Sequence, residues 1–297
     1  MKILHEDQIK MDVKIVKCLI NEQFPQYKDL PIYEFNSTGT VNYIFRLGND
    51  YYVRLPMHKT YENSILREYE ILRYISNKIS ITIPQIIGLG KPNVLYPCHW
   101  AIYNWINGNY YDNNKITYFK DIVLELVNFI NELHSINLLE NAPKAGRKLL
   151  VELNSLTIEN LNNSKDEIEY RKAIKICEIL INTPLWNNKP VWIHADLLKP
   201  NILIDNNHIL GIIDFGSSGI GDPAFDIIPA WAVFNKENRN IFRNKLNVCD
   251  DIWNRACAYA LHQAALIIPY YRNSNQSFVK YAIDTINEII IDYKGIV

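Results

Sequence analysis

The sequence has few cysteines and no closely spaced pair of them. The five cysteines, at positions 18, 98, 177, 249 and 257, are odd in number and widely spaced, and none belongs to a C-x-x-C pair. This pattern argues against both a zinc site and a disulfide framework. We expect buried or incidental thiols in a reducing cytoplasm.

Long apolar runs and a dominant charge are also missing. No stretch approaches the roughly 18–20 apolar residues that span a bilayer, and the N-terminal MKILHEDQIK lacks the apolar core of a signal peptide. A formal net charge of -1 gives no global field to attract nucleic acid or anionic lipid. We therefore expect a cytoplasmic protein with no membrane and no nucleic acid among its partners.

The chain is long enough for a sizeable core. Its 297 residues, 48% hydrophobic and 21% charged, suit one large domain or two ordinary ones. In the N-terminal part, helical spacing of apolar residues predicts helices over 5–22 and 61–76. Short β-rich runs separated by turn signals predict antiparallel strands within 32–55, and two further strands within 81–90 and 99–108.

After Gly108 the helical period dominates. Predicted helices cover residues 117–135, 166–181, 236–247, 250–268 and 277–293. A strand hairpin turning at Asn206 and Asn207 interrupts them. The change of pattern near residues 105–110 predicts a boundary between two parts of the chain, residues 1–106 and 107–297.

The hairpin region holds the most informative stretch, WIHADLLKPNILIDNNHILGIIDFGSSGIGDPAFD, from Trp192 to Asp226. Asp196 and Asn201 precede its first strand, and Asp214 follows the second. A hairpin would bring the three side chains to one edge. Hard oxygen ligands suit Mg²⁺, and in phosphoryl transfer a separate carboxylate accepts the hydroxyl proton. A lone aspartate is better explained as a cap, but all three at this spacing favour a site.

These motifs resemble a known family. His194, Asp196 and Asn201 form H-x-D-x-x-x-x-N, and D-F-G follows, as in protein-kinase-like folds. GIGDPAFD comes directly after D-F-G, without Ala-Pro-Glu, which is similar to the aminoglycoside phosphotransferase family. The stretches STGTVNYIFRLGNDYYVRLP, REYEIL, IPQIIGLG and AIYNWINGN follow the order of that family's N-lobe.

The resemblance covers roughly residues 32–230 and implies an α+β, bilobal protein-kinase-like fold. Its N-lobe, over 1–106, would bind the nucleotide with a small antiparallel β-sheet and one key helix. Its C-lobe, over 107–297, would be mainly helical and would hold the catalytic and acceptor-binding residues. Asp196 would be the catalytic base, while Asn201 and Asp214 would hold Mg²⁺ on the nucleotide phosphates. His194 would brace the loop through a hydrogen bond, and Lys199 would either touch the γ-phosphate or be solvated.

Arg54 stands where kinases usually carry a phosphate-binding lysine. An arginine still offers a permanent charge and a fork of donors to phosphate. Glu68, on the first helix of the N-lobe, is the expected partner of Arg54, with Glu70 as the exposed alternative.

Two further stretches are expected to contact the nucleotide. Ser37, Gly39 and Thr40 lie where a phosphate-covering loop belongs, although an ordinary hairpin turn explains this single-glycine stretch equally well. Asn104 and Ile106, in the YNWIN hinge, are expected to meet the purine. The choice between ATP and GTP stays open.

The acceptor-binding residues have no clear motif. Asp222 and Asp226 are expected to pin the catalytic loop and cap the next helix. Four acidic residues are candidates for a polycationic acceptor, although solvated helix faces explain them equally well: Asp250, Asp251, Asp284 and Glu288. Five aromatic residues are expected to lie in the core rather than against an acceptor: Trp231, Trp253, Tyr259, Tyr270 and Tyr271.

Together these observations predict a Mg²⁺-dependent O-phosphotransferase that moves the γ-phosphate of ATP or GTP to a hydroxyl of an aminoglycoside. An alternative is a kinase of another small molecule, such as a macrolide, homoserine, choline or a sugar. A further alternative is a non-catalytic nucleotide-binding module, which the arginine at position 54 and the glycine-poor loop would suit. Intact base and metal-ligand positions argue against that last alternative.

Overall fold

The computed structural model describes residues 8–35, 41–112, 116 and 118–295. The chain forms two compact units, one made of residues 1–109 and 210–217, the other of 110–209 and 218–297. The boundary predicted between residues 106 and 107 stays a prediction, since this division gives the first unit a second, later segment.

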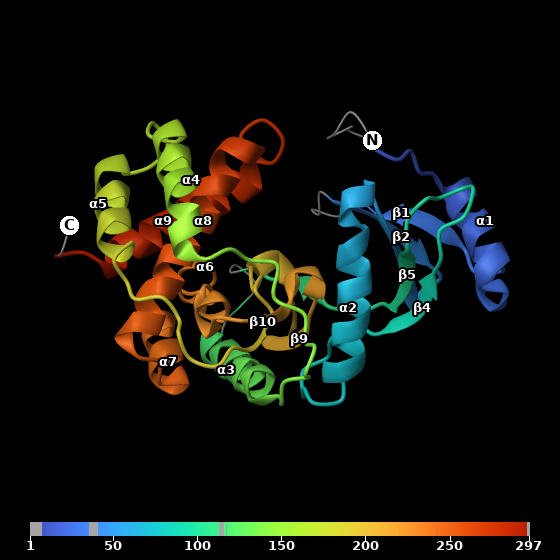
Figure 1. The fold of residues 1–297 in the computed structure, drawn as a ribbon, viewed down its shortest axis with the longest axis horizontal. Helices are drawn as coiled ribbons and strands as arrows, with labels where there is room; N and C mark the ends of the chain where they lie inside the picture. The colour runs from blue at the N-terminus through green and yellow to red at the C-terminus, as the bar shows by residue number, and fades with distance from the viewer. Residues whose placement is uncertain (1–7, 36–40, 113–115, 117, 296–297) are drawn as a thin grey trace. The chain divides into compact units, whose positions relative to one another are not determined.

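The described residues of the first unit form an antiparallel sheet and two α-helices (Figure 1). The sheet order is β1-β2-β3-β5-β4. The elements are α1 (Val13–Gln23), β1 (Ile32–Phe35), β2 (Asn42–Leu47), β3 (Tyr51–Pro56), α2 (Glu62–Ile75), β4 (Ile86–Gly90) and β5 (Trp100–Asn104). The strands and the inserted helix agree with the sequence prediction.

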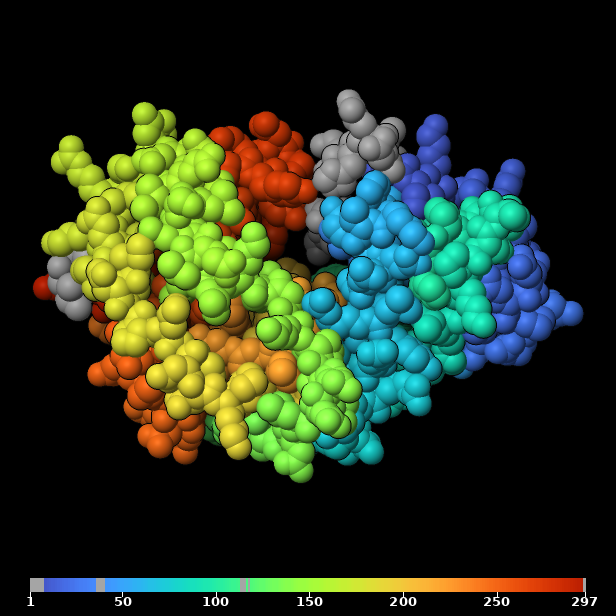
Figure 2. All heavy atoms as spheres, in the orientation of Figure 1, coloured from blue at the N-terminus to red at the C-terminus, as the bar shows by residue number. Residues whose placement is uncertain are grey.

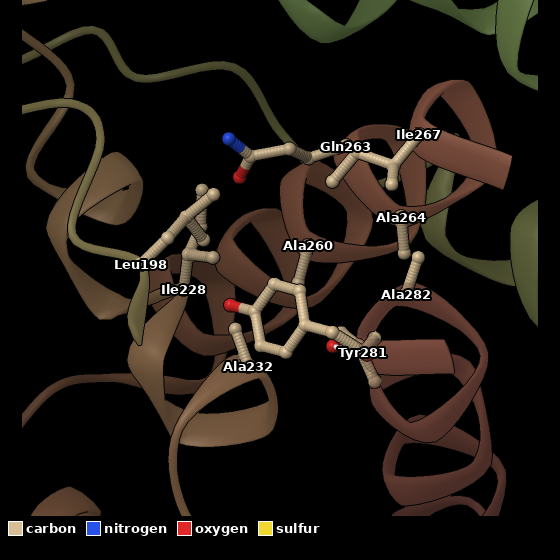
Figure 3. Close-up of a pocket in the computed structure, with 10 residues that line it drawn as sticks. Leu198, Ile228, Ala232, Ala260, Gln263, Ala264, Ile267, Tyr281 and Ala282 are labelled. Carbon is tan, nitrogen blue, oxygen red and sulfur yellow. Dashed lines mark hydrogen bonds between the residues drawn. The ribbon is translucent and has the colours of Figure 1, made fainter. Parts of the chain in front are cut away.

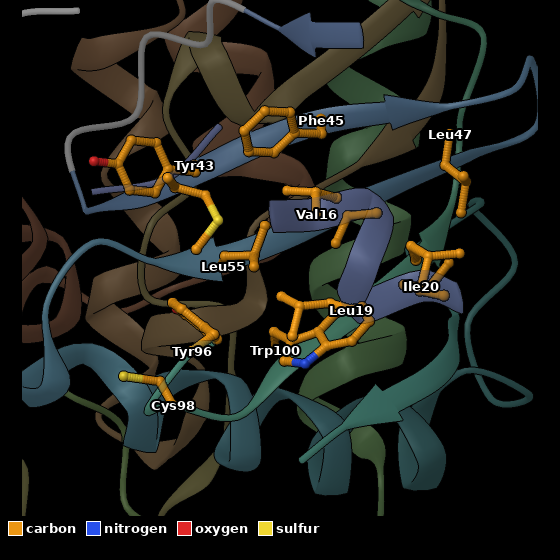
Figure 4. Close-up of a cluster of buried hydrophobic side chains, with 13 residues drawn as sticks. Val16, Leu19, Ile20, Tyr43, Phe45, Leu47, Leu55, Tyr96, Cys98 and Trp100 are labelled. Atoms are coloured by element: carbon orange, nitrogen blue, oxygen red, sulfur yellow. The ribbon is translucent and has the colours of Figure 1, made fainter. Parts of the chain in front are cut away.

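Helix α1 covers one face of this sheet. Val16 and Leu19 belong to the same fully buried cluster as Phe45 and Trp100 on the strands (Figure 4). The predicted helix 5–22 starts too early, because the side chain of Asp12 caps the helix by accepting from the backbone N of Ile15 at 2.8 Å. The apolar residues just before Asp12 pack on the same cluster, but the described part of this segment is not helical.

The second unit is mainly helical. Its helices are α3 (Phe119–Ser135), α4 (Leu150–Asn163), α5 (Tyr170–Leu180), α6 (Pro229–Ala232), α7 (Lys236–Leu246), α8 (Asp250–Tyr271) and α9 (Gln276–Asp292). Short strands interrupt them: β6 (Asn109–Tyr110), β7 (Val191–Ile193), β8 (Ile202–Asp205), β9 (His208–Ile212) and β10 (Gly219–Gly221). Strands β6 and β9 each include residues that belong to the first unit. The predicted α+β class is confirmed.

The helices of the second unit differ from the sequence prediction at several points. The prediction lacks helix α4, which packs beside α5 at the surface (yellow-green in Figures 1 and 2), and the short α6. The helix predicted over 166–181 begins only at Tyr170. Helix α8 runs past the predicted end at residue 268. Pro269 lies in its last turn and does not end the helix there. The hairpin turn is confirmed: Asn206 and Asn207 both have positive φ, 46° and 69°, as a type I′ turn requires.

Two expected absences can be examined in the described part of the chain. All five cysteines are free thiols, and Cys98, Cys177 and Cys257 are buried. Within residues 8–295, apart from the short gaps given above, no helix is both long and apolar enough to cross a membrane.

Candidate active site

Arg54 lies on β3 in the first unit and bridges two carboxylates. Its Nη1 donates to Oε2 of Glu68 at 2.9 Å, and its Nη2 donates to Oδ1 of Asp214 at 3.0 Å. The predicted pairing with Glu68 is therefore present, and Glu70 is exposed. The side chains of Arg54 and Glu68 are 8% and 1% exposed, whereas that of Asp214 is 44% exposed. This cluster has a buried end and an open end.

Glu68 is the buried end of the cluster. It lies on the core-facing side of α2 with Ile65. Oε2 also accepts from the hydroxyl of Tyr103 at 2.8 Å, and Oε1 accepts from the backbone N of Phe215 at 3.1 Å. Burial raises the pKa of Glu68 above its usual value, although the charge of Arg54 opposes the shift. These bonds fix the carboxylate that holds Arg54.

Asp214 is the open end. It follows β9 and has a left-handed φ of 67°, which is costly for a residue with a side chain and is typical of functional loops. A Cβ at Gly216 would lie 3.4 Å from both Nη2 of Arg54 and Oδ1 of Asp214, so a side chain there would contact the ion pair. One guanidinium against two carboxylates leaves an excess of negative charge at an exposed carboxylate, which suits a cation.

In the second unit, β7 leads into the predicted catalytic loop. His194 is fully buried, and its Nδ1 accepts from the backbone N of Asp196 at 3.2 Å, so it braces the loop as predicted. Ala195 has a left-handed φ of 66°. The buried carboxylate of Asp226 accepts from the backbone N of His194 at 3.1 Å and of Ala195 at 2.8 Å, and pairs with Nε2 of His134 at 2.9 Å. Asp226 therefore pins this conformation.

The carboxylate of Asp196 is held by three side chains. Oδ1 accepts from Nη2 of Arg147 at 2.6 Å and from Nε2 of Gln263 at 2.9 Å, while Oδ2 accepts from Nδ2 of Asn201 at 3.1 Å. Nδ2 of Asn201 also donates to the backbone O of Asp196 at 2.8 Å. Its nitrogen is thus committed to the loop, and its amide oxygen is the atom that could bind a cation. Asp196 itself remains 23% exposed.

The structure thus groups Asp196 with Asn201, and Arg54 with Glu68 and Asp214. The predicted convergence of Asp196, Asn201 and Asp214 at one edge stays a prediction. Arg147 and Gln263 were missed, since neither belongs to a motif and each reaches Asp196 only through the fold.

Lys199 is partly buried, and no carboxylate among the described residues pairs with it at ion-pair distance. Its Nζ lies 5.8 Å from the ring centroid of Tyr111 and 5.4 Å from that of Tyr281. Burial lowers the pKa of Lys199 below its usual value. A cation held between aromatic faces is a better candidate for meeting an anion than a solvated lysine would be.

Asp222 has the structural role that was predicted. Its side chain caps the short 3-10 helix Pro223–Ile227 by accepting from the backbone N of Ala224 at 3.0 Å. Both oxygens also accept from Arg255, at 2.7 Å from Nε and 3.3 Å from Nη2. Asp222 is buried in this pair and faces no ligand space.

The predicted nucleotide contacts are only partly described. Ser37, Gly39 and Thr40 lie outside the described residues. Asn104 ends β5, where its backbone N donates to the carbonyl of Gln85 at 3.1 Å and its side-chain oxygen accepts from the Gln85 N at 2.6 Å. Ile106 is buried. The purine-binding roles of Asn104 and Ile106 stay predictions.

The acidic acceptor candidates are mostly paired with basic residues of the chain. Asp250 pairs with Arg243, Asp284 with Lys280 at 2.8 Å, and Glu288 with Arg239 at 3.0 Å. Asp251 is exposed in the first turn of α8. Trp231, Trp253 and Tyr259 are buried, as predicted for core residues, whereas Tyr270 is 56% exposed.

A small apolar pocket lies beside the Asp196 loop in the second unit (Figure 3). Its lining includes Leu198 from the loop, Ala260 and Gln263 from α8, and Tyr281 from α9. Oε1 of Gln263 is buried and has no hydrogen-bond partner among the described residues, while its Nε2 holds Asp196. One side chain thus connects the pocket to the predicted base.

The comparisons with known proteins agree with this arrangement. The sequence profile of the phosphotransferase enzyme family (APH) matches residues 33–259. The chain belongs to this phosphotransferase family. Membership identifies it as a kinase that transfers phosphate from a nucleotide to a hydroxyl group. A Lactococcus lactis protein described as a probable aminoglycoside 3′-phosphotransferase is 25% identical over 226 residues, 71% of this chain and 82% of that protein.

Solved structures of the same family share the fold. The GDP and kanamycin complex of APH(2″)-IIIa superposes with a TM-score of 0.71 at 17% identity, covering 93% of this chain and 98% of that one. A macrolide 2′-phosphotransferase type I superposes with a TM-score of 0.61 at 14% identity, covering 94% and 98%. The predicted kinase-like fold is confirmed; at these identities the likeness concerns the fold alone.

Proposed function

We propose that this phosphotransferase moves the γ-phosphate of ATP or GTP to a hydroxyl of an aminoglycoside, with Mg²⁺. The observation that carries the proposal is the pair of carboxylates set in opposite surroundings. Asp214 is exposed in a cluster with excess negative charge, and Asp196 is fixed by three donors yet remains 23% exposed. The first suits a metal, and the second suits a base.

The residues have distinct roles in this proposal. Asp196 orients the acceptor hydroxyl and takes its proton, and Arg54 and Lys199 attract the phosphates. Asp214 and the amide oxygen of Asn201 would hold Mg²⁺, which usually takes few protein carboxylates and keeps water and phosphate as its other ligands. No group of three or more His, Cys, Asp or Glu that could hold a metal occurs in the described part of the chain, so a zinc-type site has no support there. When bound, Mg²⁺ neutralises charge on the phosphates.

The acceptor class rests on the relatives. The Lactococcus relative is described as an aminoglycoside enzyme, and a similar structure contains kanamycin. A macrolide is the second candidate, because a macrolide phosphotransferase shares the fold over 94% of the chain. ATP and GTP are both candidate donors, because one similar structure contains GDP and another contains ATP.

A substrate panel tests the proposal. The protein is incubated with Mg²⁺ and ATP or GTP, in parallel, with aminoglycosides, macrolides and small hydroxy metabolites. We expect acceptor-dependent release of nucleoside diphosphate and a phosphorylated aminoglycoside detected by mass spectrometry. A phosphorylated macrolide alone would replace the acceptor class. Nucleotide binding without transfer to any acceptor would contradict the proposal and favour a non-catalytic module.

A further inference from the structure

The two oxygens of the Asp196 carboxylate have different surroundings. Oδ1 accepts from both Arg147, at 2.6 Å, and Gln263, at 2.9 Å. Oδ2 accepts one bond, from Asn201 at 3.1 Å. Because Oδ1 is occupied by two donors, Oδ2 is the oxygen with room for an acceptor hydroxyl.

Arg147 is fixed in this position by backbone as well as by charge. Its Nε donates to the carbonyl of Ala195 at 2.8 Å. The segment just before it pairs with β10: the backbone N of Ala145 donates to Ile220 O at 3.0 Å, and Ile220 N donates to Pro143 O at 2.8 Å. Arg147 is therefore fixed within the second unit, beside the proposed base.

A guanidinium next to the base has a consequence for the acceptor. An isolated carboxylate would attract an ammonium group standing beside the reacting hydroxyl, but Arg147 already neutralises Asp196 and occupies Oδ1. Two acids on α9 that were predicted to contact a polycationic acceptor, Asp284 and Glu288, are paired with Lys280 and Arg239. Lys199 adds a second cation on the same loop.

We propose that Arg147 is a specificity-determining residue that disfavours acceptors carrying an ammonium group next to the phosphorylated hydroxyl. This inference rests on the proposed function. In the reaction, the acceptor hydroxyl gives its proton to Oδ2 of Asp196 and its oxygen bonds to the γ-phosphorus. The bond from that phosphorus to the bridging oxygen breaks, and the nucleoside diphosphate leaves with that oxygen.

Two acceptors provide a matched test. Kanamycin A and kanamycin B carry a hydroxyl and an amine, respectively, beside the 3′-hydroxyl. The wild type should phosphorylate the 3′-hydroxyl of kanamycin A with the higher kcat/KM. Arg147→Gln should raise the ratio of kcat/KM for kanamycin B over kanamycin A roughly tenfold, whatever its effect on overall activity. Arg147→Lys keeps the charge and should keep the wild-type ratio.

Lys148→Gln is the matched control. Lys148 is the exposed neighbour of Arg147, and its removal should leave the ratio unchanged. An unchanged ratio in Arg147→Gln, or an equal shift in Lys148→Gln, would overturn the inference while leaving the proposed function intact. NMR of the wild-type product is a test that needs no substitution: phosphate on a hydroxyl flanked by an amine would also overturn the inference. No transfer to any acceptor would overturn the proposed function and this inference with it.

Discussion

The two units each contain an arginine–carboxylate pair, and the pairs differ in exposure. The side chains of Arg54 and Glu68 are 8% and 1% exposed, whereas those of Arg147 and Asp196 are 30% and 23% exposed. Charges removed from water must stay paired, so Glu68 fixes Arg54 in place. The second pair stays open to a ligand. Burial, more than the kind of partner, therefore distinguishes the supporting carboxylate, Glu68, from the proposed base, Asp196.

The balance of charge also differs between the two clusters. Arg54 faces two carboxylates, Glu68 and Asp214, which leaves negative charge for a metal. Asp196 is one carboxylate with Arg147 and two amide donors, which leaves no net charge. The first cluster is thus suited to a cation and the second to a neutral hydroxyl.

Removing one carboxylate from each cluster should give the largest contrast. We expect Asp196→Ala to lower kcat by about 10²–10⁴-fold, because the base is lost, while Mg–nucleotide affinity stays near normal. Asp214→Ala should lower both turnover and Mg–nucleotide affinity. Steady-state kinetics and calorimetric titration with Mg–nucleotide measure the two effects. Exposed Asp205→Ala is the control, and near-normal turnover in Asp196→Ala would contradict the base assignment.

Removing the arginine from each pair should lower the free energy of unfolding by different amounts. Arg54→Gln leaves Glu68 buried without its cation and should lower the free energy of unfolding by about 3–5 kcal/mol. Arg147→Gln affects a pair whose side chains are 30% and 23% exposed, and it should lower the free energy of unfolding by about 1 kcal/mol or less. Urea denaturation of both variants measures this difference. Equal losses would show that exposure does not distinguish the pairs.

Acid should affect the two units in opposite senses. In the second unit, Nδ1 of His262 is 2.7 Å from Oγ1 of Thr157, and burial, with a smaller effect of Arg147, lowers the pKa of His262 to about 4. A lowered histidine pKa gives stability that is present above the unfolded pKa of about 6.5 and is lost as pH falls toward 4. The loss should be at most about 3 kcal/mol.

The contribution of Glu68 to the stability of the first unit has the opposite pH dependence. Its pKa is raised by burial, so its contribution is present below the unfolded pKa and is lost as pH rises through the raised value. Hydrogen exchange measured at pH 7 and pH 5 can follow each unit separately. His262→Gln should reduce the acid sensitivity of the second unit; an unchanged acid sensitivity would rule out this histidine as its source.

The sequence was most informative where local chemistry decides the structure. The turn at Asn206 and Asn207 was predictable because asparagine tolerates the positive φ of a type I′ turn. The Arg54–Glu68 pair was predictable from the resemblance to kinases, because Arg54 stands at the position of their phosphate-binding lysine and Glu68 on the helix that follows. Asp226 was predictable as a pin from its place after the D-F-G motif.

Helix α4 was not predictable from its pattern. Its buried face includes a threonine, Thr157, between Leu153 and Leu161, so the apolar period is interrupted. Leu149 stands at the N-cap, where no side-chain oxygen marks the start of the helix. The packing of α4 against α8 supplies what the local signal lacks.

Arg147 and Gln263 could not be found from the sequence for a different reason. They are 49 and 67 positions from Asp196, respectively, and nothing beside them in the chain marks them as partners of a base. Only the fold brings a loop residue and a helix residue to the same oxygen. The three predicted positions, Asp196, Asn201 and Asp214, have local motifs, whereas the groups that surround the Asp196 carboxylate do not.

The absence of a side chain at Gly219 limits which substitutions this protein can accept. A Cβ there would lie 2.5 Å from both Pro143 O and Ala145 N, the segment that leads to Arg147. Even alanine would force that segment away from β10. In a library of random variants, position 219 should therefore tolerate almost no replacement, and surviving variants should carry altered acceptor preference. Selection for new substrates would then act through a residue that has no side chain, by way of the segment packed against it.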